Sequence, residues 1–264
     1  MKIGVGRMKK LKTSPFSVAK FMLFLLVLLW VEAGWAIPDE EIRKIQAGLQ
    51  GKTTGEKIAF FAERFVGTLY DEDPQGLYVS KTAIVADERV DCMYLTFRAV
   101  ELALSDTPEE AVQIALEKRF HSQGILQDGR VVNYDDRYQY GEDMLQSGKW
   151  GREITSEIGR TIRISGSRGK DFWEILLPRE IKQGMKKIKS GDIFFFFTPP
   201  EKRKVNEGVG HIGFVKVEKR SGGKKIYLIH ASGSKNKGGA VKKVLLPDYI
   251  SKMPFVGVKI TRFE

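Results

Sequence analysis

A single cysteine, Cys92, occurs among the 264 residues, so the chain forms no intramolecular disulfide. Histidine is nearly as scarce, with three residues, and no Cys/His cluster has the spacing of a zinc site. The sequence also lacks a Walker-type phosphate loop and a glycine-rich dinucleotide fingerprint. We therefore expect neither a metal nor another cofactor, and any chemistry must come from few side chains.

No hydrophobic run is long enough to cross a bilayer. Residues 21–31 are eleven consecutive apolar residues, whereas a membrane-spanning helix needs about 20. The run follows a basic stretch and precedes Gly34 and Ala36, small residues at the places that a signal peptidase reads. We therefore expect a signal peptide over residues 1–36, cleavage near Ala36, a periplasmic or secreted protein, and no membrane span after processing. An uncleaved N-terminal anchor is the alternative.

Composition is that of an ordinary globular protein, with 42% hydrophobic and 29% charged residues. The net charge is +11, but residues 1–36 hold six Lys or Arg and one acidic residue, which leaves +6 on residues 37–264. This charge favours an anionic partner such as a cell-wall polymer and does not require nucleic acid. We expect one domain over residues 37–264 and have no indication of its oligomeric state.

Hydrophobic periodicity predicts an α+β protein, with most helices in the first half and strands in the last third. Glycines divide the apolar pattern of residues 39–69 into two helices, and Thr107 with Pro108 begins another helix that runs to about residue 121. Between the helices, residues 77–90 are expected to be β-rich or irregular. Residues 122–180 form an insert that contains a short helix over residues 143–151. The expected later strands are residues 193–197, 211–217, 225–230, 240–245 and 256–261.

Cys92 is expected to begin a helix that continues to residue 104. Asp91 precedes it as an N-cap, and no Gly or Pro interrupts the segment. Free N–H groups and the helix dipole stabilise a thiolate in the first turn of a helix, and the thiolate is the nucleophilic form of cysteine. Cys92 is therefore a candidate nucleophile, with a small buried hydrophobic residue as the alternative.

Two of the histidines, His211 and His230, lie at the open ends of the expected hairpin. A two-residue or four-residue loop around Ser221 places them on one face and diagonally adjacent, whereas a slip of one residue separates them. If they are adjacent, His211 can take a proton from Cys92 while His230 orients the His211 ring. The alternative for each histidine is a structural strand-end residue.

The order of these motifs resembles the NlpC-type papain-like cell-wall hydrolases, and within them the N-acetylmuramoyl-L-alanine amidase-like branch, formerly a domain of unknown function. The resemblance covers about residues 55–260 and includes the long insert between the cysteine helix and the next strand. The segments that carry it are Gly67-Thr68-Leu69-Tyr70, Asp91-Cys92, Thr96-Phe97, Glu101-Leu102-Ala103-Leu104, Arg137-Tyr138-Gln139-Tyr140, Gly191-Asp192-Ile193-Phe194, His211-Ile212-Gly213-Phe214 and Ile229-His230-Ala231-Ser232.

The resemblance implies a papain-like core, in which an antiparallel sheet packs on the helix that starts at the nucleophile, with extra N-terminal helices and an insert. It implies acyl transfer, with Cys92 as nucleophile, His211 as base and His230 as orienting residue. The substrate-binding residues that it implies are Tyr70, Asp91, Arg137 and Ser232. Their structural alternatives are, in the same order, a packed aromatic ring, a helix N-cap, a solvated surface arginine and a strand end.

The implied reaction is cleavage of the bond between the muramoyl lactyl group and L-alanine in peptidoglycan or muropeptides. A γ-D-glutamyl–diaminopimelate endopeptidase, the commoner activity of the wider family, is the alternative enzyme. A non-catalytic cell-envelope binding protein is the alternative from another class, and the presence of Cys92, His211 and His230 argues against it.

Overall fold

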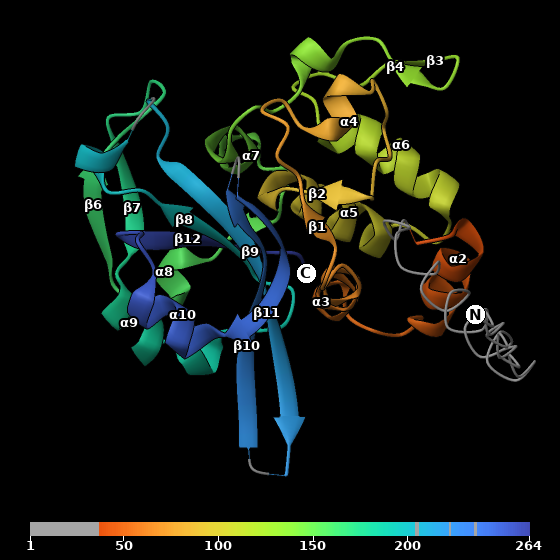
Figure 1. Ribbon diagram of the computed structural model, residues 1–264. Helices are drawn as coiled ribbons and strands as arrows, with labels where there is room; N and C mark the ends of the chain where they lie inside the picture. Colours follow the sequence, from red (N-terminus) through yellow and green to blue (C-terminus); the bar gives the residue numbers. More distant parts are fainter. Residues whose placement is uncertain (1–36, 204–205, 222, 235–236) are drawn as a thin grey trace, which may run out of the picture. The chain divides into compact units, whose positions relative to one another are not determined.

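A ten-stranded sheet runs through the protein in the computed structural model, which describes residues 37–203, 206–221, 223–234 and 237–264 (Figure 1). The predicted signal peptide, residues 1–36, lies outside these described residues. All neighbouring strands pair antiparallel except β1 and β2. In sheet order the strands are β2 (Arg89–Val90), β1 (Leu69–Tyr70), β11 (Gly238–Leu245), β10 (Gly223–Ser234), β9 (Val209–Arg220), β8 (Ile193–Phe197), β12 (Gly257–Arg262), β7 (Phe172–Leu176) and β6 (Thr161–Ser165), with β5 (Arg152–Glu153) beside β12.

Strand β8 lies at the centre of the sheet and is buried on both faces. Phe195 and Phe197 belong to one hydrophobic core and Phe194 and Phe196 to a second, because successive side chains point to opposite faces of a strand. The run of apolar residues 193–197 predicted this double burial. Helices cover each face, so the described residues form three layers (Figure 1). The first face carries α2 (Asp39–Gly48), α3 (Thr54–Arg64), α5 (Cys92–Leu104) and α6 (Pro108–Lys118), and the second α8 (Thr155–Ile158), α9 (Pro178–Gln183) and α10 (Leu246–Lys252).

The helices of the first face begin where the sequence predicts. The two expected helices of residues 39–69 are α2 and α3, and α3 starts with a capping box between Thr53 and Glu56. Helix α6 starts at the expected cap, where the Thr107 side chain accepts a hydrogen bond of 3.1 Å from the backbone N–H of Glu110. It ends at Lys118, three residues earlier than expected. Among the described residues, no helix has the length and apolar character needed to cross a membrane.

Short elements differ most from the prediction. The segment expected to be β-rich, residues 77–90, contains the helical turn α4 (Leu77–Ser80) and only the two residues of β2 as strand. The helix expected over residues 143–151 is α7 (Gly141–Ser147), which ends at Gly148 in the left-handed conformation. Helices α9 and α10 were not predicted, because six or seven residues carry too little periodicity to be recognised. The small elements are β3 (Leu126–Gln127) paired with β4 (Arg130–Val131), and the 3₁₀ turns η1 (Tyr134–Asp136), η2 (Met185–Lys187) and η3 (Pro200–Lys202).

A buried ionic network ties the segment before Cys92 to the first helical layer. Arg98 donates to both carboxylate oxygens of Asp87, at 2.8 and 3.1 Å. Arg119 donates to both oxygens of Glu101, at 2.6 and 2.7 Å, and to the carbonyl oxygen of Ile84 at 2.8 Å. The four charged side chains are at most 3% exposed. Because Arg98 lies in α5 and Arg119 directly follows α6, the network fixes residues 84–87 against the helix that begins with Cys92.

Candidate active site

Cys92 is the first residue of α5, as the sequence predicts. The Asp91 carboxylate accepts a hydrogen bond of 2.7 Å from the backbone N–H of Tyr94, which is the expected N-cap interaction. This cap fixes the direction in which the helix begins and therefore the position of the thiol. Cys92 itself is partly buried and free of any disulfide.

The hairpin of β9 and β10 brings His211 and His230 together. Arg220 pairs with Gly223 and Phe214 with Ile229, so the register is the one that makes the two histidines diagonal neighbours on one face. His211 Nε2 lies 2.8 Å from His230 Nδ1, with the rings nearly perpendicular. The predicted adjacency of the two rings is confirmed.

An interruption in the sheet brings Cys92 to these histidines. The pairing between β9 and β10 ends at Phe214 and Ile229, whereas β10 continues to pair with β11 as far as Ser234. The backbone N–H of Ile212, the residue after His211, helps to lower the pKa of the Cys92 thiol, and α5 packs on β9. The nucleophile candidate therefore lies against the strand that carries the base candidate.

The Cys92 thiol and the His211 imidazole are not directly hydrogen-bonded in this structure. Among the described residues, no hydrogen bond joins the Cys92 thiol to the His211 ring. His211 Nε2 is engaged by His230, so Nδ1 is the atom left to receive a proton. Catalytic hydrogen bonds are often long before substrate binds, so His211 stays a candidate base for Cys92.

Burial keeps both partners neutral at neutral pH. It raises the pKa of the Cys92 thiol to about 12, with a further contribution from Asp91. Burial and the neighbouring His230 lower the pKa of His211 to about 3. The expectation of a stabilised thiolate is wrong for the resting protein, because loss of water around the sulfur outweighs the helix start.

Burial, reinforced by Lys242, also lowers the pKa of His230 to about 4, so we expect acid to destabilise the fold. An unfolded histidine has a pKa of about 6.5, so the unfolded chain gains the proton first as the pH falls. Stability is then lost between pH 6.5 and 4. Urea unfolding at pH 7 and at pH 4.5 measures how much the free energy of unfolding falls in acid. This fall should be about 2 kcal/mol smaller in His230→Gln than in the wild type.

The matched control for this measurement is His121→Gln, because His121 is exposed, as the sequence suggests. That variant should keep the wild-type pH dependence. An identical acid-induced loss in His230→Gln and the wild type would contradict the neutral buried ring.

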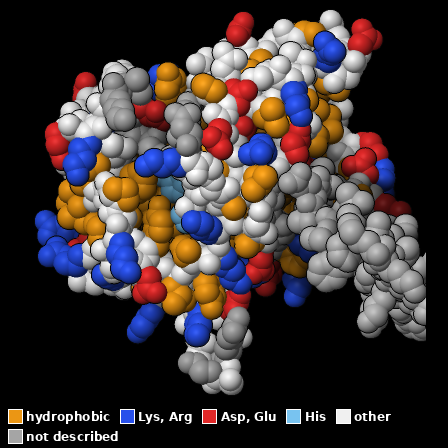
Figure 2. Space-filling view, viewed as in Figure 1, with side chains coloured by type: hydrophobic (Ala, Val, Ile, Leu, Met, Phe, Trp, Pro, Cys, Tyr) orange, Lys and Arg blue, Asp and Glu red, His pale blue; other side chains and the backbone are white. Residues whose placement is uncertain are grey.

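Aromatic side chains enclose the histidine pair. Phe255 stacks parallel to His211 with ring centroids 5.9 Å apart, and Tyr249 of α10 packs edge-on to His230 at 4.9 Å. Figure 2 shows histidine atoms reaching the surface beside hydrophobic side chains. Sequence reasoning missed Tyr249 and Phe255, because the short helix α10 that positions Tyr249 leaves no recognisable signal. Together these rings exclude water from one side of the pair.

Tyr70 lies in strand β1, where it pairs with Val90, two residues before Cys92. Burial raises its pKa, and the charge of a Cys92 thiolate adds to that shift. The ring packs against Gly233, where a side-chain Cβ would lie 2.2 Å from the Tyr70 ring. Gly233 therefore permits the observed position of the Tyr70 ring.

Ser232 and Arg137 are the two other residues named from the resemblance. Ser232 lies two residues after His230 in β10, so its side chain points to the same face of the sheet. Arg137 donates a hydrogen bond of 3.0 Å to the carbonyl oxygen of Tyr134.

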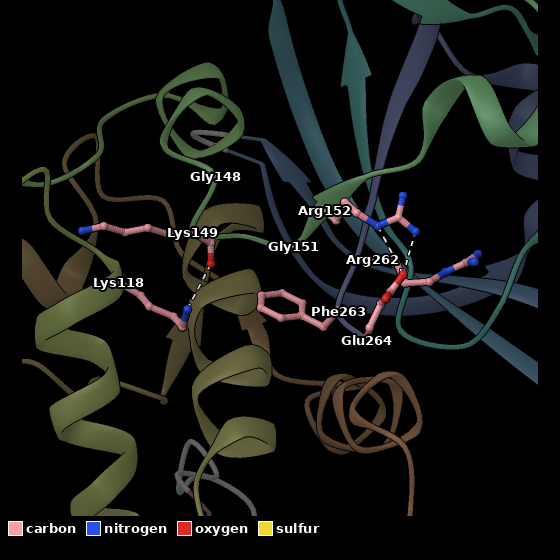
Figure 3. Close-up of a pocket in the computed structure, with 8 residues that line it drawn as sticks. All are labelled: Lys118, Gly148, Lys149, Gly151, Arg152, Arg262, Phe263 and Glu264. Atoms are coloured by element: carbon pink, nitrogen blue, oxygen red, sulfur yellow. Dashed lines mark hydrogen bonds and ion pairs between the residues drawn. The ribbon is translucent and has the colours of Figure 1, made fainter.

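A separate pocket of about 430 Å³ lies near the end of the chain (Figure 3). Its cations already have partners: Lys118 donates to the Lys149 carbonyl oxygen at 3.1 Å, and Arg152 binds Glu264 at 2.6 Å. None of the catalytic candidates lines it. In the part of the chain that the structure describes, no group of three or more His, Cys, Asp or Glu side chains is placed to hold a metal ion.

Solved structures share this arrangement of elements. A protein of Legionella pneumophila, described with the family model DUF1460, matches with a TM-score of 0.62 at 15% identity, over 84% of this chain and 93% of its own. An N-acetylmuramoyl-L-alanine amidase from Bacteroides uniformis matches with a TM-score of 0.59 at 18% identity, over 80% of this chain and 99% of its own. The chain has the fold of these proteins.

A further structure with the same amidase name, also from B. uniformis, gives a TM-score of 0.56 at 19% identity, over 79% of this chain and 98% of its own. No family model matches the sequence, and no curated protein matches it. At these identities the likeness extends to the fold alone, so the chemistry has to be argued from the residues.

Proposed function

We propose that the protein is an exported cysteine hydrolase that cleaves an amide bond in peptidoglycan fragments, with the bond between N-acetylmuramic acid and L-alanine as its target. The observation that carries this proposal is the His211–His230 contact next to a thiol at a helix start. The amidase names of two structural neighbours support the choice of bond. The order of motifs supports an NlpC-type papain-like assignment and a periplasmic or secreted location.

In the proposed reaction, Cys92 attacks the carbonyl carbon of the amide while its proton passes to His211 Nδ1. For this role the His211 ring must carry its own hydrogen on Nε2 and donate it to His230 Nδ1. His211 then gives the proton to the leaving amine, and water hydrolyses the thioester. His230 acts by holding the tautomer of His211.

The negative charge on the carbonyl oxygen needs donors in the tetrahedral intermediate. The backbone N–H of Cys92 lies in the first turn of α5, where N–H groups have no helical acceptor. The Tyr70 hydroxyl is the second candidate donor, because burial raises its pKa and keeps it protonated. Asp91 is engaged as the N-cap, which supports a structural role more than a substrate contact, whereas Arg137 and Ser232 stay candidates for substrate binding.

Product identification tests the proposed bond. Residues 37–264 are incubated with a purified disaccharide tetrapeptide, and the products are weighed by mass spectrometry. Release of a free peptide that begins with L-alanine supports the amidase. Release of a disaccharide dipeptide transfers the proposal to the γ-D-glutamyl–diaminopimelate endopeptidase, and an intact substrate favours the non-catalytic binding protein.

A further inference from the structure

The long hairpin of β9 and β10 extends beyond the body of the sheet and carries lysines near its tip (Figure 1). Lys219 in β9 and Lys224 in β10 are both exposed, and they are direct partners in the hairpin register. Like charges that lie directly opposite each other across two antiparallel strands destabilise the pairing. The stability of the hairpin therefore does not explain why two lysines occupy these positions.

The two lysines lie on the face of the hairpin that continues the second hydrophobic core. Val217 and Ile226 pair with each other, and both pack in that core. Val217 is two residues before Lys219 and Ile226 is two residues after Lys224, so the four side chains point to the same face. Lysines therefore replace apolar side chains where this face reaches beyond the core.

A neighbouring segment of the chain adds three more exposed lysines. Lys186, Lys187 and Lys189 flank the buried Ile188. The Lys224 ammonium donates a hydrogen bond of 3.1 Å to the Ile188 carbonyl oxygen, which places this segment beside the hairpin. The basic patch consists of the five exposed lysines Lys186, Lys187, Lys189, Lys219 and Lys224.

Carboxylates near the basic patch each bind a cation outside it. These pairs are Glu218 with Lys243, Asp192 with Arg262, and Glu157 with Arg152. Lys187 donates to the backbone carbonyl oxygen of Glu157 at 2.8 Å, and a carbonyl oxygen carries no charge that would neutralise an ammonium group. Among the residues that the structure describes, no ion pair joins the five lysines to a carboxylate, so their charge is available to an anionic partner.

The arrangement of the basic patch fits an extended surface of phosphate groups. None of its lysines lines the pocket of Figure 3, and they come from two separate segments. Lysine presents a compact point charge, whereas arginine presents a planar fork that suits carboxylates. Clusters of about four to eight basic residues bind anionic lipids in proteins that lie at membrane surfaces, and each residue adds to the affinity.

We propose that the basic patch docks the protein on a membrane surface rich in anionic phospholipid. Lys224 precedes His230 by six residues of one strand, which corresponds to about 20 Å. The membrane would therefore contact the far end of the hairpin and leave the catalytic candidates open to substrate. The docking surface does not depend on the proposed hydrolase activity, because it involves other residues.

Sedimentation with lipid vesicles tests the docking surface. Residues 37–264 are mixed with vesicles of phosphatidylglycerol and phosphatidylcholine in equal parts, or with vesicles of phosphatidylcholine alone. At about 50 mM NaCl we expect at least tenfold stronger partitioning to the anionic vesicles, and release at about 500 mM NaCl, because salt screens exposed charges. The patch variant, Lys219→Gln/Lys224→Gln, should partition to the anionic vesicles about tenfold less than the wild type.

The matched control is Lys44→Gln/Lys81→Gln, which removes two positive charges from outside the basic patch. Both lysines are exposed, and each pairs with a carboxylate, Lys44 with Glu40 and Lys81 with Glu88. This control should partition within twofold of the wild type. The patch variant should unfold at the same urea concentration as the wild type or at a higher one, because it loses a like-charge pair. Its weaker binding would then not result from misfolding.

Equal partitioning to neutral and anionic vesicles, no binding at low salt, or equal losses in the patch variant and the control would overturn the docking surface. Binding to isolated peptidoglycan that depends on the same two lysines, without binding to vesicles, would assign the basic patch to a cell-wall polymer and would also overturn the membrane proposal. The assay involves no bond cleavage, so a failure of the proposed hydrolase activity would leave its outcome unchanged.

Discussion

Replacing Cys92 by alanine is expected to lower kcat for muropeptide cleavage by about 10⁴-fold or more, because nucleophile removal leaves only binding and oxyanion stabilisation. The sequence has no second thiol that can substitute for it. The rate of L-alanyl peptide release, measured by mass spectrometry under saturating substrate, gives the comparison. The same loss is expected for the wild type after complete alkylation with iodoacetamide.

Histidine variants provide the matched comparison for this prediction. His211→Ala removes the base and should lower kcat by about 10²–10⁴-fold. His121→Ala removes a histidine that is exposed and should leave kcat within twofold of the wild type. Turnover by Cys92→Ala within tenfold of the wild type would contradict the thiol mechanism, provided that the variant unfolds at the same urea concentration.

Arg119→Met should lower the free energy of unfolding by about 3–5 kcal/mol, because it leaves the Glu101 carboxylate buried without its main partner. Glu101 is fully buried, and its remaining cation, Arg98 Nη1, lies 3.6 Å away. The substitution also removes the bond from Arg119 to the Ile84 carbonyl oxygen. Urea unfolding followed by fluorescence at pH 7 measures the change.

Two further variants separate the charge effect from loss of packing. Arg119→Met/Glu101→Leu removes both charges and should recover much of the stability, because the unpaired carboxylate is gone. Arg43→Ala breaks an exposed ion pair with Glu109 and should cost less than about 1 kcal/mol. If Arg119→Met is no more destabilised than Arg43→Ala, the network does not have the stabilising role argued from its burial.

Local sequence signals predicted the elements that are long or sharply bounded. Three such signals each predicted an element that the structure contains: the cap before Cys92, the cap at Thr107 and the five apolar residues of β8. The insert was harder, because its helices and strands have at most seven residues and their conformation depends on tertiary contacts.

The histidine pair was predictable because a hairpin register follows from its turn, and the turn residues are visible in the sequence. The raised pKa of the Cys92 thiol was not predictable from the sequence. A helix start is a local feature, whereas the pKa of Cys92 also depends on its burial in the folded protein and on the charge of Glu207, which is distant in the sequence.

The interruption between β9 and β10 has a consequence for how the protein folds. Leu69 pairs with Ala240 across most of the chain, and the helix that begins with Cys92 packs on the distant strand β9. Contacts of such long sequence separation form slowly, because the chain must first be brought together at an entropic cost. During refolding, far-UV circular dichroism should recover before muropeptide cleavage does. Enzymatic turnover would then serve as the sensitive reporter of complete folding for this chain.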